Sequence, residues 1–468
     1  MTFVGLSRIE PFAFFAAAAL VGCGAALGAY FTEPFVPLAV AAGAALVVLS
    51  VSSPMTVLYA AVALVPLELL SVKVGAAGLS PAEAAFALSG VGWGISRVIQ
   101  GEAPVARSPL SAPLLLLVLA LVPGIAIVPE PFDVLKVFLI WGTFFLVFQM
   151  IIAEGSMQTV KYVLFVLGLS GAVVGIIAIV QSGGRPPELI GFGELASGRA
   201  QGSFGHPNTL ATFEAVALPG ALALGLKGPP SWRPFALAAF GVIFAGLALS
   251  LSRGGLLAVA GALLMMLAWP PFRRTVLAAG LVLGVLALSG ANVFGEVQQV
   301  ELLTQRLGSI GYAAEGVDPR FRVWEVTPEI VMDHPVFGIG ENSFPRVAQR
   351  YALFLGNSTS TYDHAHNIPL TIAAELGLVG LAVLAWLAVA FVRVLLQAYR
   401  RSNPEDRGLV LALAGAFLAL TLQGMVDYTL RSAVIVAVIF MLAGCAAVMA
   451  GAGRSAQSPD TAPSSPPP

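Results

Sequence analysis

The stretch MQTVKYVLFVLGLSGAVVGIIAIVQ, residues 157–181, decides the fold class of this chain. Apart from Lys161 it carries no charge, and its apolar residues are continuous rather than alternating with polar ones. A run of about 20 apolar residues is long enough to cross a bilayer as a helix. Only helices and closed barrels satisfy the backbone in hydrocarbon, and continuous runs favour helices. The stretch therefore predicts a transmembrane helix.

The whole chain has a composition similar to that of this stretch. Of its 468 residues, 58% are hydrophobic and only 10% are charged, whereas a soluble domain carries about 25% charged residues. The mean hydropathy is +0.89. The net charge is −1, so the chain has no excess of positive charge that would indicate a nucleic-acid partner. The composition predicts an all-α polytopic protein surrounded by membrane lipids.

About 14 apolar runs of spanning length follow one another along the chain. Their approximate limits are 11–31, 35–52, 54–72, 81–99, 109–128, 133–153, 157–181, 206–226, 234–252, 255–271, 274–292, 368–394, 409–426 and 431–451. Residues 1–292 would hold the first eleven spans, residues 293–367 a large loop, and residues 368–451 the last three spans. Residues 452–468 are rich in Pro and Ser and are predicted to be a disordered tail.

The orientation follows from Lys and Arg in short loops, which favour the cytoplasmic side. The loop with Lys227 and Arg233 and the loop with Arg273 and Arg274 are short and basic. They predict that both termini and the tail are cytoplasmic. A smaller loop at about 182–205 and the large loop would then be extracytoplasmic. Long loops are usually functional, so the site is expected in these two loops.

Two arginines beside apolar runs are candidates for binding an anion. Arg253 lies in LSLSRGGLLA, where a guanidinium so close to lipid marks either a functional site or a side chain that reaches the lipid phosphates. Arg199 lies in GRAQGSFGHPNTLA, where Pro207 would begin a helix capped by His206 or by the residues before it. Free N–H groups at such a helix start suit a phosphate.

His366 is the candidate for proton transfer, in TYDHAHNIPLTIAAELGLVG, where a polar loop enters a spanning helix. Histidine titrates near neutral pH and can take a proton from a hydroxyl. Asp363 or His364 would orient it, and Asn367 would support the loop. The alternative is a histidine that only caps the helix.

Arg320 and Arg322 open RFRVWEVTPEIVMDHPVFGIGENSFP, which predicts a short amphipathic helix ended by Pro335 and a glycine turn. On a helix the two arginines would lie about 200° apart, and on a strand they would share a face. We predict a supporting role for both at the substrate. The outside loops hold no DxD-type carboxylate pair and the chain no Walker A motif, so no metal, ATP or cofactor is expected.

These blocks resemble the bacterial O-antigen ligase and O-antigen polymerase family from about Gly198 to Leu381. In the ligase pattern, His is followed by Asn, Ser or Gln, then by nine residues and then by GxxG. Here His366 and Asn367 are followed by nine residues and then Gly377 and Gly380. The pattern often continues with two threonines, which this chain lacks.

The resemblance implies a metal-independent, inverting glycosyltransferase of the bacterial inner membrane. It would move a glycan from undecaprenyl pyrophosphate to a hydroxyl on the periplasmic face. His366 would be catalytic, and Arg199 and Arg253 would bind the donor pyrophosphate. The acceptor is lipid A core for a ligase, a second lipid-linked repeat for a polymerase, or a protein hydroxyl. The alternative of another class is a secondary transporter, whose polar pathway would include Glu214 and Glu375.

Overall fold

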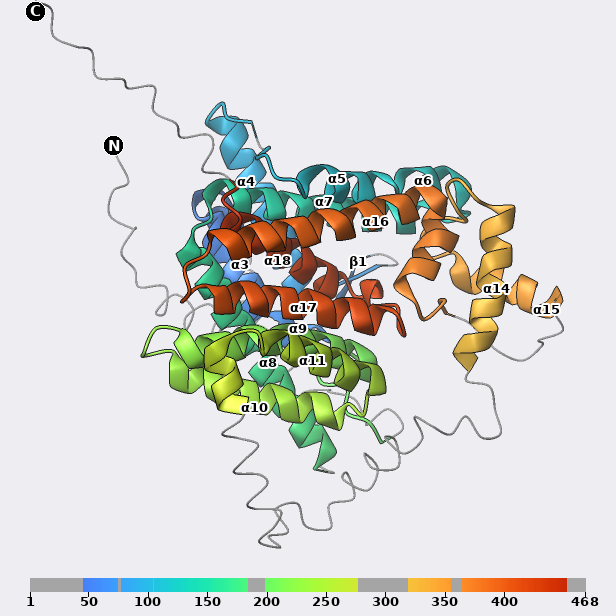
Figure 1. Ribbon diagram of the computed structural model, residues 1–468. Coiled ribbons are helices and arrows are strands. Elements are labelled where there is room, and N and C mark those ends of the chain that lie inside the picture. The colour runs from blue at the N-terminus through green and yellow to red at the C-terminus, as the bar shows by residue number, and fades with distance from the viewer. Residues whose placement is uncertain are drawn as a thin grey trace, which may run out of the picture.

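The computed structural model describes residues 45–74, 77–103, 105–183, 198–276, 319–354 and 363–452. In this part the chain is helical except for one short hairpin and connecting turns (Figure 1). The expected span 11–31, most of 35–52, nearly all of 274–292 and the C-terminal tail lie outside the described residues. So do parts of both expected extracytoplasmic loops.

Apolar helices form the body of the structure (Figure 1). Five are long and apolar enough to cross a membrane: α7 (Pro131–Glu154), α8 (Met157–Ser182), α9 (Pro207–Lys227), α16 (Ile368–Arg401) and α17 (Arg407–Gly424). Six further helices accompany them: α3 (Pro54–Ala63), α4 (Pro81–Ile99), α5 (Ser111–Leu119), α10 (Arg233–Leu249), α11 (Arg253–Met266) and α18 (Ala433–Met449). The short helix α6 (Val122–Ile127) leads from α5 into α7. The predicted helical membrane fold is confirmed, while the count of 14 spans and their orientation stay predictions.

Local sequence explains where these helices begin. Ser80 and Ser156 form capping boxes at the starts of α4 and α8, and proline occupies the first turn of α9 and α16. Small residues then let the helices approach closely, as lipid-embedded helices require. A Cβ on Gly175 of α8 would lie 2.7 Å from the carbonyl oxygen of Val242 in α10.

The expected span 54–72 differs from the structure. Helix α3 ends at Ala63 and is followed by a 3-10 turn, η2 (Val65–Leu67), and by the antiparallel strands β1 (Val72–Val74) and β2 (Ala77–Leu79). Lys136 Nζ of α7 donates to the carbonyl oxygen of Gly78 at 2.7 Å and holds the hairpin against that helix. A ten-residue helix covers only about 15 Å, so α3 is too short to span a membrane alone.

The large loop contains two helices, α14 (Pro319–Asp333) and α15 (Phe344–Phe354). Val323, Val326 and Ile330 of α14 pack with Phe344 of α15 in an apolar cluster of their own. The predicted helix ended by Pro335 and a glycine turn is confirmed. Arg320 and Arg322 therefore lie on a helix, about 200° apart around its axis.

The segment after α14, residues 334–340, docks onto a break in α16. Gly377 has φ 68° and ψ −170°, so the predicted continuous span 368–394 is interrupted there. Ile339 N donates to Ala374 O at 2.9 Å, and Leu378 N donates to Pro335 O at 2.8 Å. A Cβ on Gly377 would collide with the carbonyl of Val336. The GxxG motif thus marks the place where the loop joins the helix.

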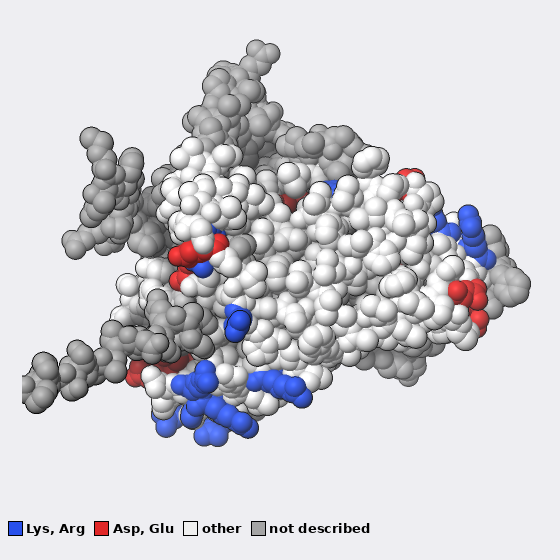
Figure 2. All heavy atoms as spheres, turned by 90° about the horizontal axis from the view of Figure 1, so that it is seen from above, with Lys and Arg blue, Asp and Glu red and all other residues white. Residues whose placement is uncertain are grey.

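The helix directions give the bundle two different ends. Basic residues lie at one end, in the last turns of α9 and α16 and at the starts of α10 and α17: Lys227, Arg233, Arg400, Arg401 and Arg407. At the opposite end, α9, α11 and α16 begin. Figure 2 shows a broad face without charged side chains between charged regions, as expected for a surface that meets lipid.

Candidate active site

Helices α9, α11 and α16 begin with polar N-caps at the end of the bundle opposite the basic one. The Nδ1 of His206 accepts from Asn208 N at 3.2 Å in α9, and Ser252 Oγ accepts from Gly255 N at 3.3 Å in α11. Asn367 Oδ1 accepts from Leu370 N at 2.9 Å in α16. The first turn of a helix presents free N–H groups and a positive dipole end, so this end of the bundle favours an anion.

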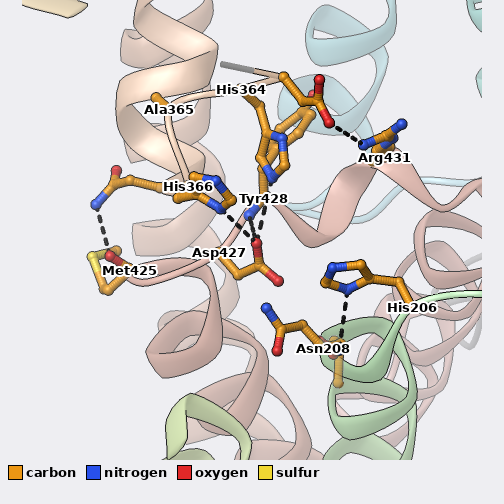
Figure 3. A network of polar contacts seen from close by, with 12 residues as sticks. His206, Asn208, His364, Ala365, His366, Met425, Asp427, Tyr428 and Arg431 are labelled. Atoms are coloured by element: carbon orange, nitrogen blue, oxygen red, sulfur yellow. Dashed lines mark hydrogen bonds and ion pairs between the residues drawn. The ribbon is translucent and has the colours of Figure 1, made fainter. Parts of the chain in front are cut away.

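Two histidines meet one aspartate at this end (Figure 3). His366 Nδ1 lies 3.2 Å from Asp427 Oδ1, and His364 Nε2 lies 3.4 Å from the same oxygen. Asp427 follows α17, whereas the histidines precede α16, so the packing of α16 and α17 brings them together. Asn367 Nδ2 adds a bond to Met425 O at 3.0 Å, which ties the histidine loop to the end of α17.

Asp427 is buried and serves as an acceptor for several donors. Tyr428 N donates to its Oδ1 at 3.0 Å. Burial alone would raise the pKa of Asp427, but the hydrogen bonds and charge attraction of His364 and His366 outweigh burial and hold the pKa below its ordinary value. The carboxylate therefore stays ionised and orients both rings.

The contact with Asp427 sets the chemistry of His366. If Nδ1 carries the proton donated to Asp427, Nε2 keeps a lone pair and can act as a base. The His366 side chain is 32% exposed, and that of His364 is 12% exposed. The His364 Nδ1 is buried without a hydrogen-bond partner among the described residues. His366 is thus the better placed of the two to meet a substrate from outside.

Backbone strain gathers around this site. The non-glycine residues with positive φ in the described part of the chain are Leu251, Asn342 and His366, at φ 50°, 61° and 50°. Leu251 comes two residues before Arg253, and Asn342 lines the cavities described below. Such strain costs on the order of 1 kcal/mol or more per residue and is typical of functional sites.

His206 lies on another side of Asp427 (Figure 3). Burial lowers the pKa of His206 from its ordinary value, Asp427 opposes this effect, and the charges of Arg199 and Arg431 reinforce it. These electrostatic contacts place the start of α9 beside the histidine–aspartate cluster. The predicted cap role of His206 is confirmed.

The two candidate anion-binding arginines come from neighbouring positions in the bundle. Arg199 Nε donates to Ser250 O at 2.9 Å, and its Nη2 donates to Asn208 Oδ1 at 2.8 Å, so it joins the end of α10 to the start of α9. Arg253 is the first residue of α11 and is half-buried. A Cβ on the next residue, Gly254, would touch Gln423 of α17. Arg253 therefore starts its helix beside the segment that leads to Asp427.

The remaining predicted site residues make fewer contacts with the histidine–aspartate cluster, or play a different part in it than predicted. Asp363 faces Arg431 across 3.7 Å, and both side chains are mostly exposed, so the structure gives the orienting contact to Asp427 rather than to Asp363. His364 shares Asp427 with His366 instead of orienting it directly. Arg320 is half-buried in α14, and the Arg322 side chain lies outside the described residues.

The cluster borders one cavity through His364, and a second cavity adjoins the first. One, of about 100 Å³, is lined by His364, Glu375 and Tyr428, and the neighbouring one, of about 270 Å³, is lined by Trp141 and Glu341; Asn342 and Arg431 line both. The ligand atoms of His364, His366 and Asp427 lie within 4.8 Å of one another, a spacing that a divalent cation could also bridge. Removal of metal is therefore part of the test below.

Sequence reasoning missed Asp427, although a signal was present. The residue lies directly after the apolar run 409–426, in the short connection MVDYTLR. The count of spans puts this connection on the same side of the membrane as His366. An acid at that position is a reasonable partner, but 61 residues separate the pair, and no local pattern links them.

Fold and site together define a multi-pass helical membrane protein with a histidine–aspartate cluster at one end of its bundle. Residues 238–385 match the family described as O-Antigen ligase, which confirms the predicted resemblance over this part of the chain. The match includes Arg253, His366 and the break at Gly377. No curated protein matches the chain. The match supports, in general terms, a membrane enzyme.

Proposed function

We propose that the protein transfers a glycan from undecaprenyl pyrophosphate to a hydroxyl acceptor, as a ligase of the O-antigen type. The observation that carries the proposal is the pairing of the ionised Asp427 with His366, which lies inside the region 238–385 that matches the O-Antigen ligase family. A polymerase, which joins two lipid-linked repeats, would use the same chemistry with a different acceptor.

The arrangement supports a single displacement. His366 Nε2 takes the proton of the acceptor hydroxyl while the acceptor oxygen forms a bond to the anomeric carbon. The bond from that carbon to the pyrophosphate oxygen breaks, and the pyrophosphate leaves with the electron pair. Attack from the side opposite the leaving group inverts the anomeric centre. Asp427 balances the positive charge that forms on His366.

The leaving pyrophosphate gains charge and needs cationic partners. Arg199 is held by Ser250 and Asn208, and Arg253 stands at the start of α11, so neither has to be recruited from solvent. Guanidinium groups bind phosphate oxygens through charge-assisted and often bidentate bonds. Arginines that contact the leaving oxygen would stabilise the transition state more than the ground state. In this proposal the step is metal-independent.

The proposed location is the bacterial inner membrane, with the site on the periplasmic face. The basic helix ends, including Lys227 and Arg407, lie opposite the site, and basic residues favour the cytoplasmic side. The donor lipid would lie against the apolar face between the two ends (Figure 2).

The test is glycan transfer by the full chain in vesicles that contain lipid-linked repeat units and a core-oligosaccharide lipid. We expect wild type to make product in EDTA and His366→Ala to lose about a hundred-fold or more of the rate, the contribution of a general base. His334→Ala, a change of an exposed histidine in the same loop region, is the matched control.

Product size separates ligation from polymerisation. Full activity of His366→Ala would overturn the assignment of the base, and loss of wild-type activity in EDTA that returns with added cation would overturn the metal-free step. If wild type makes no product but moves a labelled substrate across the vesicle membrane, the protein is a transporter.

A further inference from the structure

A polar cavity of about 270 Å³ shares Asn342 and Arg431 with the smaller cavity that His364 lines. Its wall comes from β2, the starts of α4 and α7, residues 341–342 of the loop before α15, and the connection between α17 and α18. The lining residues that carry polar or aromatic groups are Glu83, Asp133, Lys136, Trp141, Glu341, Asn342 and Arg431. The proposed transfer step needs none of them.

Glu341 is the buried anchor of this wall. The residue is 5% exposed, and its Oε2 has no hydrogen-bond partner among the described residues. Its Oε1 accepts from the hydroxyl of Tyr428 at 3.4 Å. A buried polar atom without a partner is costly, and native structures rarely leave one unless a ligand or water completes it. Glu341 also interacts with the neighbouring carboxyl of Glu375, and this buried pair presents an oxygen that can accept from a hydroxyl or amino group of a ligand.

Two further side chains give the cavity the other features of a carbohydrate site. Trp141 is only 3% exposed and lies in the wall, where an aromatic face can pack on the C–H groups of a sugar ring. Lys136 reaches the cavity while its Nζ is held by Gly78 O at 2.7 Å, so its position is fixed before a ligand arrives.

Size and charge argue for a sugar rather than a phosphate. The volume lies just below the roughly 300–1,000 Å³ of pockets for drug-sized ligands, which suits about one sugar ring. The wall has three carboxyl groups, Glu83, Asp133 and Glu341, against two cations, Lys136 and Arg431. This balance does not favour a dianionic group, whereas carboxyl groups accept hydrogen bonds from hydroxyls.

The cavity lies away from the proposed donor side. Arg199 and Arg253 belong to the segments around α9, α10 and α11, none of which lines the cavity. Figure 3 shows Asp427 near both Arg431, which lines the cavity, and His206, the N-cap of α9. The proposed donor-binding arginines and the cavity therefore belong to different helices around the cluster.

We propose that this cavity binds one sugar ring of the acceptor glycan and presents its hydroxyl to the histidine–aspartate cluster, with Glu341, Asp133 and Trp141 as specificity-determining residues. The inference rests on the proposed transferase function. It assigns the acceptor, rather than the lipid-linked donor, to the side of the cluster formed by α4, α7 and the β1–β2 hairpin.

The test uses Glu341→Gln, Asp133→Asn and the double variant of the full chain in detergent. Glu130→Gln is the matched control, because Glu130 also lies at the start of α7 but its side chain is 65% exposed and does not line the cavity. Steady-state transfer is measured with acceptor and donor varied separately. Binding is titrated by saturation-transfer NMR with two lipid-free probes, core oligosaccharide and repeat-unit oligosaccharide.

We expect each cavity variant to raise the acceptor KM about ten-fold, the loss expected for one hydrogen bond to a charged group, and to change the donor KM less than two-fold. Wild type should bind one of the two probes, and the double variant should lose that binding. A raised donor KM, or unchanged acceptor KM in all variants, would overturn the inference. Absence of transfer by wild type would refute the proposed function instead, while the NMR titration would still decide whether the cavity binds glycan.

Discussion

The middle of the bundle and its site end are built in different ways. Around α8, α9 and α10 the contacts are apolar and close, with Gly168 beside Ala221 and Gly175 beside Gly246. At the site end, polar caps, a buried carboxylate and strained backbone at His366 and Leu251 replace such contacts. Packing can therefore hold the helices together without positioning the site residues. Their positions depend on a few non-local polar contacts.

Asp427→Asn should separate the two regions most clearly. The amide cannot balance a positive charge on His366 and would hold the wrong tautomer, so we expect activity to fall roughly a thousand-fold or more. The bundle should stay folded, because Asp427 lies outside the packed helices, and the thermal midpoint in detergent checks this. Asp363→Asn, an exposed carboxyl beside the same loop, should keep at least half of the activity. Equal losses of activity in the two variants would mean that the histidine loop needs negative charge nearby but not the specific contact with Asp427.

Gly377→Ala tests whether the site end depends on its backbone geometry. A side chain would meet the Val336 carbonyl and would have to adopt φ 68°, so we expect about 2–4 kcal/mol of destabilisation and loss of activity. Gly142→Ala in α7 is the control, because its Cβ would meet nothing within 4 Å. That change should leave the midpoint unchanged or raise it slightly. Similar midpoints for the two variants would show that the docked loop contributes little.

Glu341 should give the site end a pH dependence of its own. Burial raises the pKa of Glu341 from 4.5 to about 7, although Tyr428 and Glu375 lower it in part. The folded protein then keeps a proton that the unfolded chain releases between about pH 4.5 and 7. Its contribution to stability therefore falls as the pH rises through that window and levels off above it.

Thermal midpoints of wild type and Glu341→Gln, measured from pH 4.5 to 8.5, check this sign. The difference should shift in favour of the Gln variant as the pH rises, since glutamine has no proton to lose. A constant difference across the range would show that Glu341 titrates normally.

Ser252→Ala should have the smallest effect. It removes the N-cap of α11 and should cost about 1 kcal/mol of stability. Because Arg253 is the next residue, the donor KM should also rise a few-fold. Ser156→Ala removes a comparable cap at the start of α8, and it should lower the midpoint without changing the donor KM. A donor KM that rises equally in both variants would mean that Arg253 needs no local support.

The apolar runs predicted the long helices well, because burial in lipid leaves little choice of backbone. The expected limits 133–153 and 157–181 agree with α7 and α8 within a few residues. The hairpin after α3 and the break at Gly377 were not predicted, since an apolar run does not show where another segment will dock. His366 was found from its motif, but Asp427 was not, because its contact depends on how α16 and α17 pack.

The docked segment 334–340 also has a mechanical consequence. Its backbone is bonded to the first turns of α16, on both sides of the break, and the same helix starts at the loop that carries His366. A displacement of α14 or α15 is therefore transmitted to the N-terminal part of α16 through these hydrogen bonds. An acceptor that displaced the large loop would also displace His366. Contacts made at α14 and α15 could therefore change the position of the proposed base.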